Sequence, residues 1–151
     1  MKYLHTMIRT SNLDKTLDFY ITKLGLIEVK RYNNDVGRFT LVFLCASDDY
    51  ADAKNSKSPL IEITYNWPSE DGVTENLKIG RSFGHIAFRV KNIYEVCERL
   101  MKNNITINRP PKDGYMAFIK SPDNISIELL QEGDPLKVKE PWASMSNTGI
   151  W

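Results

Sequence analysis

The chain has 151 residues, of which 42% are hydrophobic and 26% are charged, and its formal net charge at pH 7 is +1. This length suits one domain, or two small modules that share a core. The balanced charge excludes a general electrostatic attraction to nucleic acids or to membrane surfaces.

The cysteines and the first residues of the chain indicate the cellular compartment. Cys45 and Cys97 are far apart and lack the C-x-x-C spacing of a redox or metal motif, so they are interpreted as buried, reduced thiols. The first residues, MKYLHTMIRT, lack the uninterrupted apolar stretch of a signal peptide. No apolar run is long enough to span a bilayer. A cytoplasmic location is therefore expected.

The first half is predicted to contain one helix and four strands. Ser11 or Asn12 can cap the helix because their side chains accept hydrogen bonds from its free N–H groups, and Gly25 is a natural stop. Apolar residues at helical spacing support the helix: Leu13, Leu17, Phe19, Tyr20 and Leu24. The segment NNDVG is interpreted as a turn. The predicted strands cover residues 3–9, 26–32, 38–44 and 60–66.

The second half is predicted to repeat this order. Asn92 caps a helix over residues 93–102, and Val96, Leu100 and Met101 are expected on its apolar side. The predicted strands cover residues 84–90, 105–108, 115–120 and 125–131, with SPDN as the turn between the last two. The tail after residue 131 has no periodicity. It is nevertheless expected to pack over its own subunit or a partner because of its large apolar residues: Trp142, Met145, Ile150 and Trp151.

The two halves are copies of one module. A shift of eighty positions places residues of the first half on identical residues of the second: His5 on His85, Arg9 on Arg89 and Asn12 on Asn92. Later, LIEITYN resembles SIELLQE at a different offset, so the polar stretch at 46–58 is interpreted as an insertion. The predicted fold is α+β, a single domain of two βαβββ modules at about 1–66 and 80–131 that form curved mixed sheets, followed by a tail at 132–151.

Each half offers one histidine early and one glutamate late: His5 and Glu62, then His85 and Glu128. Because alternate residues of a strand share a face, each pair is expected on one face of neighbouring strands. Each glutamate lies between two branched aliphatic residues, where burial of a carboxylate is costly. A salt bridge or simple exposure explains one such residue, but two matched pairs favour a metal site. Two imidazoles and two carboxylates suit a divalent ion such as Zn²⁺, Ni²⁺, Co²⁺, Mn²⁺ or Fe²⁺.

Four segments closely resemble glyoxalase I (lactoylglutathione lyase) of the vicinal-oxygen-chelate superfamily, over about residues 3–131: LHTMIRTSNLDKTLDFYITKLGL, IEITYNW, FGHIAF and SPDNISIELL. The resemblance implies the glyoxalase fold and a homodimer whose sites form between subunits. It implies that His5 and Glu62 of one chain bind one divalent ion together with His85 and Glu128 of the other. Bacterial glyoxalases fall into nickel/cobalt-activated and zinc-activated groups, and within this resemblance the moderate chain length favours Ni²⁺ or Co²⁺, with Zn²⁺ as the alternative.

The resemblance also implies an activity. Glyoxalase I isomerises the hemithioacetal of methylglyoxal and glutathione to S-D-lactoylglutathione through a metal-stabilised enediolate, which detoxifies methylglyoxal. Glu128 matches the principal base, and Glu62 matches the residue that serves the other stereoisomer of the hemithioacetal. Arg9 and Asn66 match contacts to the γ-glutamyl end of glutathione, and Lys112 is the best match for a contact to the glycyl carboxylate.

Two other readings remain open at this point. The first alternative is another metalloenzyme of the vicinal-oxygen-chelate superfamily, an epimerase or a dioxygenase. A dioxygenase would bind iron through two histidines and one carboxylate, so one of the two glutamates would have no role as a ligand. The non-enzymatic alternative is a drug-sequestering protein of the bleomycin-resistance type, which would share the repeat without a reason to keep matched histidines and glutamates.

Overall fold

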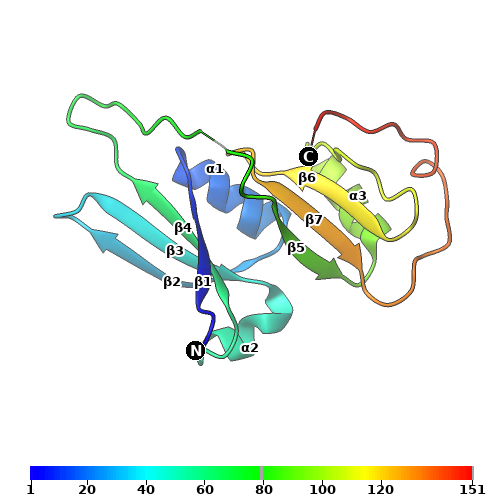
Figure 1. Cartoon of the computed structure of the whole chain (residues 1–151), viewed down its shortest axis with the longest axis horizontal. Coiled ribbons are helices and arrows are strands. Elements are labelled where there is room, and N and C mark those ends of the chain that lie inside the picture. Colours follow the sequence, from blue (N-terminus) through cyan, green and yellow to red (C-terminus); the bar gives the residue numbers. More distant parts are fainter. Residues whose placement is uncertain (79, 151) are drawn as a thin grey trace. The chain divides into compact units, whose positions relative to one another are not determined.

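The computed structural model describes residues 1–78 and 80–150. The chain divides into two compact units, Met1–Lys78 and Ile79–Trp151, and each contains its own sheet (Figure 1). Within the described residues, no helix is long and apolar enough to cross a membrane. This mixed architecture, with two mixed sheets and few helices, agrees with the predicted α+β class.

The first unit is built on a four-stranded sheet with strand order β1-β4-β3-β2. The strand β1 runs parallel to β4, and the other neighbours are antiparallel. Its elements in chain order are β1 (His5–Arg9), α1 (Leu13–Leu17), η1 (Asp18–Lys23), β2 (Ile27–Asn34), β3 (Phe39–Cys45), η2 (Ser47–Asp49), α2 (Tyr50–Ala53) and β4 (Leu60–Asn66). The predicted bounds of all four strands agree with these to within two residues.

The first helix begins and ends where its sequence predicts. The side chain of Asn12 accepts a hydrogen bond from the backbone N–H of Lys15 at 3.0 Å, which satisfies one of the free donors of the first turn. After Leu24 the chain turns at Gly25, whose φ of +95° is accessible to glycine and strained for other residues. The second part of this helix, Asp18–Lys23, is π-helical, which the apolar spacing does not indicate.

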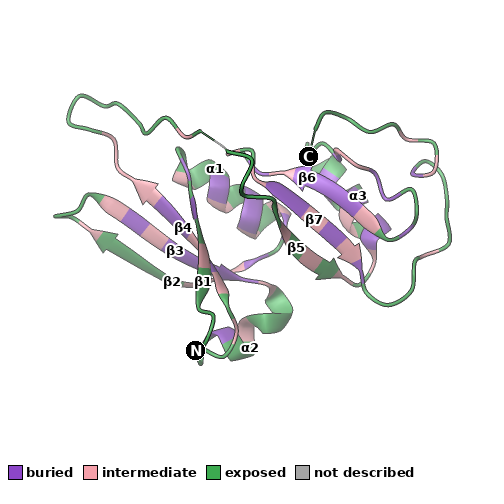
Figure 2. Ribbon diagram, in the orientation of Figure 1, coloured by how far each residue is buried: buried purple, intermediate pink, exposed green. Residues whose placement is uncertain are grey.

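Burial alternates along β4 and explains how a carboxylate is placed between aliphatic residues. Ile61 and Ile63 are buried, whereas Glu62 between them is partly exposed, as expected for alternate residues of a strand that lie on opposite faces. Buried and intermediate segments follow one another along β4 in Figure 2. The polar stretch at 46–58, which was expected to hold an insertion, contains the short helices η2 and α2. Ala53 of α2 is buried, so the insertion is anchored to the unit.

The second unit has a three-stranded sheet with strand order β5-β7-β6. The strand β5 runs parallel to β7, and β6 is antiparallel to it. Its elements are β5 (His85–Val90), α3 (Ile93–Lys102), β6 (Met116–Lys120) and β7 (Ser126–Gln131). The helix α3 packs against β6 and β7, so the unit is a sheet covered by one helix.

The strand predicted over residues 105–108 is wrong. Only one isolated bridge forms there, between Arg109 and Phe118. Pro110 and Pro111 follow at once and have no backbone N–H to continue a ladder, so pairing stops after a single step. The second unit therefore has the order β-α-β-β with one bridge, and the repeat of the βαβββ module is incomplete.

The predicted bounds and cap of α3 are confirmed, but part of its predicted apolar face is wrong. Asn92 accepts from the backbone N–H groups of two residues of the first turn. The buried residues of the helix are Ile93, Tyr94, Cys97 and Leu100, whereas Met101 is exposed. The helix is rotated so that positions 93, 97 and 100 face the sheet, a spacing of four and three residues.

The tail packs over its own unit, which confirms the expectation that it covers its own subunit or a partner. Trp142 is buried and stacks on Tyr94 of α3 with ring centroids 6.1 Å apart. The backbone N–H of Leu136 donates to the carbonyl of Gly114 at 3.0 Å. Ile150 is exposed, contrary to expectation, and Trp151 lies outside the described residues.

Candidate metal and catalytic site

The first unit brings His5 and Glu62 together. His5 on β1 pairs in register with Leu60 of the parallel strand β4, so Glu62 lies on the same face two residues further on. His5 Nε2 lies 2.9 Å from Glu62 Oε2. The carboxylate side chain is 12% exposed and the imidazole 38%, so the pair lies at a surface that is open on the histidine side.

The second unit repeats this arrangement with His85 and Glu128. His85 on β5 pairs in register with Ser126 of the parallel strand β7, which is the same offset as in the first unit. His85 Nε2 lies 3.2 Å from Glu128 Oε2, and the side chains are 43% and 13% exposed. The expectation that each early histidine and late glutamate lie on neighbouring strands is confirmed in both units.

An aromatic ring contacts each histidine. Phe43 of β3 lies opposite Glu62 and meets the His5 ring edge-on, with centroids 5.8 Å apart and planes at 75°. Phe118 of β6 lies opposite Glu128 and meets the His85 ring in the same way, at 5.5 Å and 80°. Edge-to-face contacts of this kind fix ring orientation. The sequence pattern does not identify either phenylalanine as part of the site, because an apolar residue in a strand is first interpreted as a core residue. The one signal that could have identified them is that each lies on the strand next to the glutamate of its own half.

The two copies differ in one hydrogen bond. The hydroxyl of Thr64 donates to Oε1 of Glu62 at 3.2 Å. In the second unit the corresponding residue of β7 is Leu130, whose side chain carries no donor. Glu62 is therefore restrained at both carboxylate oxygens, by His5 and by Thr64. Glu128 receives no corresponding hydrogen bond from position 130, because leucine has no hydroxyl group.

The donor atoms of each pair fit adjacent ligands of one metal ion. Nitrogen and oxygen ligands lie about 2.1 Å from Zn²⁺ and similar ions, so two ligands at about 90° are roughly 3.0 Å apart. The observed N–O separations of 2.9 and 3.2 Å match this value. Within residues 1–78 and 80–150, no group of three or more His, Cys, Asp or Glu side chains could hold a metal ion. Each pair alone offers one nitrogen and one oxygen donor atom.

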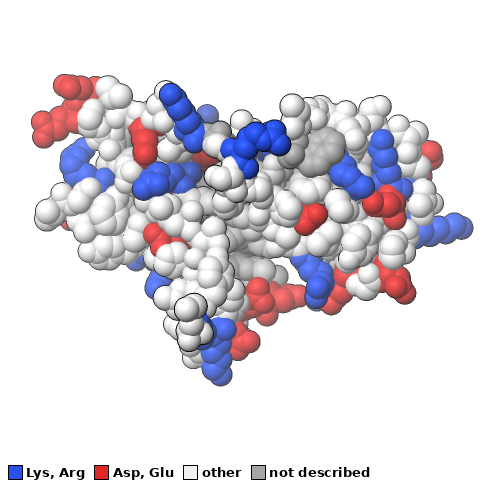
Figure 3. Space-filling view, viewed as in Figure 1, with Lys and Arg blue, Asp and Glu red and all other residues white. Residues whose placement is uncertain are grey.

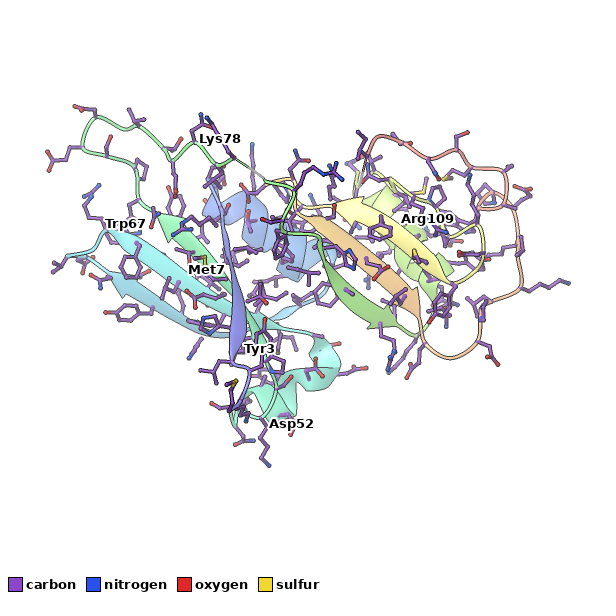
Figure 4. All side chains as sticks on the ribbon, in the orientation of Figure 1. Tyr3, Met7, Asp52, Trp67, Lys78 and Arg109 are labelled. Carbon is purple, nitrogen blue, oxygen red and sulfur yellow. The ribbon has the colours of Figure 1, made fainter. Side chains whose placement is uncertain are left out.

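Arg9 and Asn66 lie close to a third residue of the first unit. They follow His5 and Glu62 on β1 and β4, and both contact the carboxylate of Glu75. Asn66 Nδ2 donates to Glu75 Oε2 at 2.8 Å, and Arg9 Nε lies 3.8 Å from Glu75 Oε1. Figure 4 labels Met7, which stands between His5 and Arg9 on β1, and Trp67, which directly follows Asn66.

Lys112, the expected contact to a glycyl carboxylate, is exposed in the turn before β6. This turn is organised by Asp113, whose carboxylate accepts from Arg109 at 2.8 Å and from the backbone N–H groups of Tyr115 and Met116, both at 3.0 Å. Burial by itself would raise the pKa of Asp113, but the bonds from Arg109 and the two N–H groups outweigh it and lower this pKa below its ordinary value.

The two cysteines are not part of the candidate site. Both cysteines are free and buried, as expected, and burial raises the pKa of the Cys97 thiol to about 12. Such a thiol stays protonated at neutral pH and is no nucleophile. On the face shown in Figure 3, acidic and basic side chains are interspersed, in keeping with the net charge of +1.

The sequence matches a known protein family. The model of the Glyoxalase/Bleomycin resistance protein/Dioxygenase superfamily matches residues 2–129. The lactoylglutathione lyase of Neisseria meningitidis serogroup A is 38% identical over 137 residues, which cover 87% of this chain and 91% of the relative.

Two solved structures share the fold. The trypanothione-dependent glyoxalase I of Leishmania major has a TM-score of 0.75 and 35% identity, with 87% of each chain covered. The glyoxalase I of Zea mays has a TM-score of 0.73 and 27% identity, and the match covers 88% of this chain but 45% of the maize chain. The maize polypeptide is therefore about twice as long as the present one.

Proposed function

Because the chain belongs to the Glyoxalase/Bleomycin resistance protein/Dioxygenase superfamily, we propose that it is a lactoylglutathione lyase, a glyoxalase I. It isomerises the hemithioacetal of methylglyoxal and glutathione to S-D-lactoylglutathione and so detoxifies methylglyoxal. The observation that carries the proposal is the duplicated histidine–glutamate pair, His5 with Glu62 and His85 with Glu128, at the same offset on parallel strands. The curated relatives, at 34–38% identity, are named for this activity.

The active assembly is a homodimer with sites shared between subunits. His5 and Glu62 of one subunit and His85 and Glu128 of the other hold one divalent ion, with Ni²⁺ or Co²⁺ favoured and Zn²⁺ as the alternative. Support comes from the N–O separations, which suit adjacent ligands, and from the maize enzyme, which carries about two such lengths in one polypeptide. When bound, the ion supplies Lewis acidity next to the substrate's carbonyl group.

The proton transfer belongs to the two glutamates. Glu128 removes the proton from the carbon that bears sulfur and returns it to the neighbouring carbon. Two features support this role: its carboxylate is 13% exposed, which keeps bulk water from competing for the proton, and Leu130 leaves it without the hydroxyl restraint found at Glu62. Glu62, held by Thr64, serves the other stereoisomer of the hemithioacetal.

The substrate is held by cations and amides of the chain. Arg9 and Asn66 bind the carboxylate of the γ-glutamyl end, and their contact with the carboxylate of Glu75 supports this chemistry. Lys112, exposed in its turn, binds the glycyl carboxylate. The two free, buried thiols suit a reducing compartment, so the cytoplasm remains the proposed location.

The test is thioester formation from methylglyoxal and glutathione by metal-stripped protein, before and after addition of Ni²⁺, Co²⁺ or Zn²⁺. Activity should be absent from the stripped protein and return with at least one ion. Metal-loaded, dimeric protein without turnover would contradict the proposal. If the same protein bound a drug of the bleomycin type tightly, the sequestering alternative would replace it.

A further inference from the structure

Glu75 occupies the donors that the proposed substrate needs. Its two carboxylate oxygens are divided between the proposed γ-glutamyl ligands: Oε1 faces Arg9 Nε at 3.8 Å, and Oε2 accepts from Asn66 Nδ2 at 2.8 Å. A carboxylate of the chain thus sits where a carboxylate of glutathione would bind. All three side chains are part-exposed or exposed, so solvent and ligands reach them.

The loop after β4 places Glu75 by a defined path. Trp67 starts the loop and is fixed by a hydrogen bond from its indole N–H to Thr40 at 2.9 Å. A turn follows in which the N–H of Ser69 donates to the carbonyl of Val73 at 2.9 Å. Gly72 in this turn has a φ of +76°, which glycine adopts without strain. The chain reverses there and returns Glu75 to the end of β4.

Two carboxylates compete for these groups. Glu75 Oε2 takes a hydrogen bond from Asn66, Oε1 pairs with Arg9, and a second carboxylate bound to the same two side chains would be repelled by the charge of Glu75. Binding of a γ-glutamyl carboxylate should therefore displace Glu75 from Arg9 and Asn66. Only a ligand that brings its own carboxylate to this position replaces what is lost.

We infer that Glu75 is a specificity residue that fills the γ-glutamyl carboxylate subsite in the free protein and is exchanged for the carboxylate of the incoming thiol. The inference rests on the proposed function, since it takes Arg9 and Asn66 as the substrate's ligands. It has two consequences. Glu75 weakens binding of the proper substrate, and it does so only for ligands that carry a γ-glutamyl group.

The experiment measures KM and kcat for the hemithioacetal in the wild type, in Glu75→Gln and in the matched control Glu70→Gln. Glu70 is an exposed carboxylate of the same loop, so its substitution makes the same change of charge. Glu75→Gln should lower KM roughly two- to fivefold with kcat unchanged, the range that an exposed ion pair supports. Glu70→Gln should leave both constants unchanged. A KM that stays the same or rises in Glu75→Gln would overturn the inference.

Two further measurements separate competition from other effects of the loop. By calorimetry, Glu75→Gln should bind S-methylglutathione more tightly than the wild type, but S-methylcysteinylglycine, which lacks the γ-glutamyl group, equally well. Equal gains for both probes would overturn the inference. In an Arg9→Ala background, Glu75→Gln should gain less than in the wild type, and an undiminished gain would count against exchange at Arg9. A wild type without turnover and without binding of S-methylglutathione would instead refute the proposed function.

Discussion

Each histidine of the candidate site lies between a carboxylate and the edge of an aromatic ring. The carboxylate faces Nε2, and the ring of Phe43 or Phe118 limits how far the imidazole can turn. A ligand whose orientation is fixed beforehand loses less freedom when a metal binds. The phenylalanines are therefore positioning residues for the histidines.

Substitution of Phe43 or Phe118 by leucine should weaken metal binding. The edge-to-face contact is lost while most of the apolar volume remains, so the dissociation constant should rise by about two- to tenfold. Metal competition with a chromophoric chelator measures it. Phe39→Leu is the matched control, because Phe39 lies on the same strand β3 but contacts Tyr32 rather than a histidine. Metal affinity unchanged in both site variants would remove the positioning role.

The two glutamates should differ in catalysis. Glu128→Gln keeps an oxygen ligand but loses the base, so kcat should fall by ~10²-fold or more. Glu62→Gln should lose less, since its carboxylate is already restrained by Thr64. Steady-state kinetics on protein of measured metal content makes the comparison. A metal-replete Glu128→Gln enzyme with the wild-type kcat would remove Glu128 as the base.

At the scale of helices and strands, the sequence predicts the features that depend on neighbouring residues in the chain. The helix caps at Asn12 and Asn92, and the strand that carries Glu62, follow from short patterns and lie where expected. The π-helical turn at Asp18–Lys23 and the missing strand at 105–108 depend on tertiary packing and on the pair Pro110–Pro111. The contact of Glu75 depends on a loop reversal at Gly72, so no periodicity in the sequence could have revealed it.

The turn before β6 should be an acid-sensitive element. The pKa of Asp113 is lowered in the folded protein from its ordinary value of 3.8, so its contribution to stability is complete above that value. This contribution is lost as the pH falls through the lowered pKa. Asp113→Asn should therefore lower the free energy of unfolding near neutral pH, with a difference from the wild type that shrinks below about pH 4.

Denaturant unfolding at several pH values tests this prediction. Asp134→Asn is the control, because Asp134 is an exposed carboxylate of the same unit, and its effect should be small throughout. A difference between Asp113→Asn and the wild type that is constant from neutral to acid pH would contradict the assigned role of the charge.

At the scale of the whole molecule, duplication gives each unit half of the proposed ligand set. The repeat in the sequence was enough to identify His5, Glu62, His85 and Glu128 as two matched pairs, and the parallel neighbours β1–β4 and β5–β7 confirm the pairing within each unit. Which two pairs meet in the proposed site depends on how subunits assemble. Side-chain patterns along one chain carry no information about it.

Complementation tests the shared-site dimer. His5→Ala and His85→Ala proteins should each be inactive alone. After subunit exchange, each heterodimer has one site with both histidines intact, so an equal mixture should recover about a quarter of the wild-type activity, as a symmetric dimer requires. Exchange is verified by mass spectrometry of differently tagged subunits. Confirmed exchange without recovery would place all four ligands in one chain.

The burial of Trp142 against Tyr94 sets an order of events during biosynthesis. Trp142 lies 48 residues after Tyr94 in the sequence, so on a growing chain the ring of Tyr94 is made well before the indole that covers it. The first unit has no such dependence and can fold while the rest is being made, since domains generally fold from the N-terminus during synthesis. The second unit completes its core only once Trp142 has been made and has packed on Tyr94, so its folding finishes after that of the first unit.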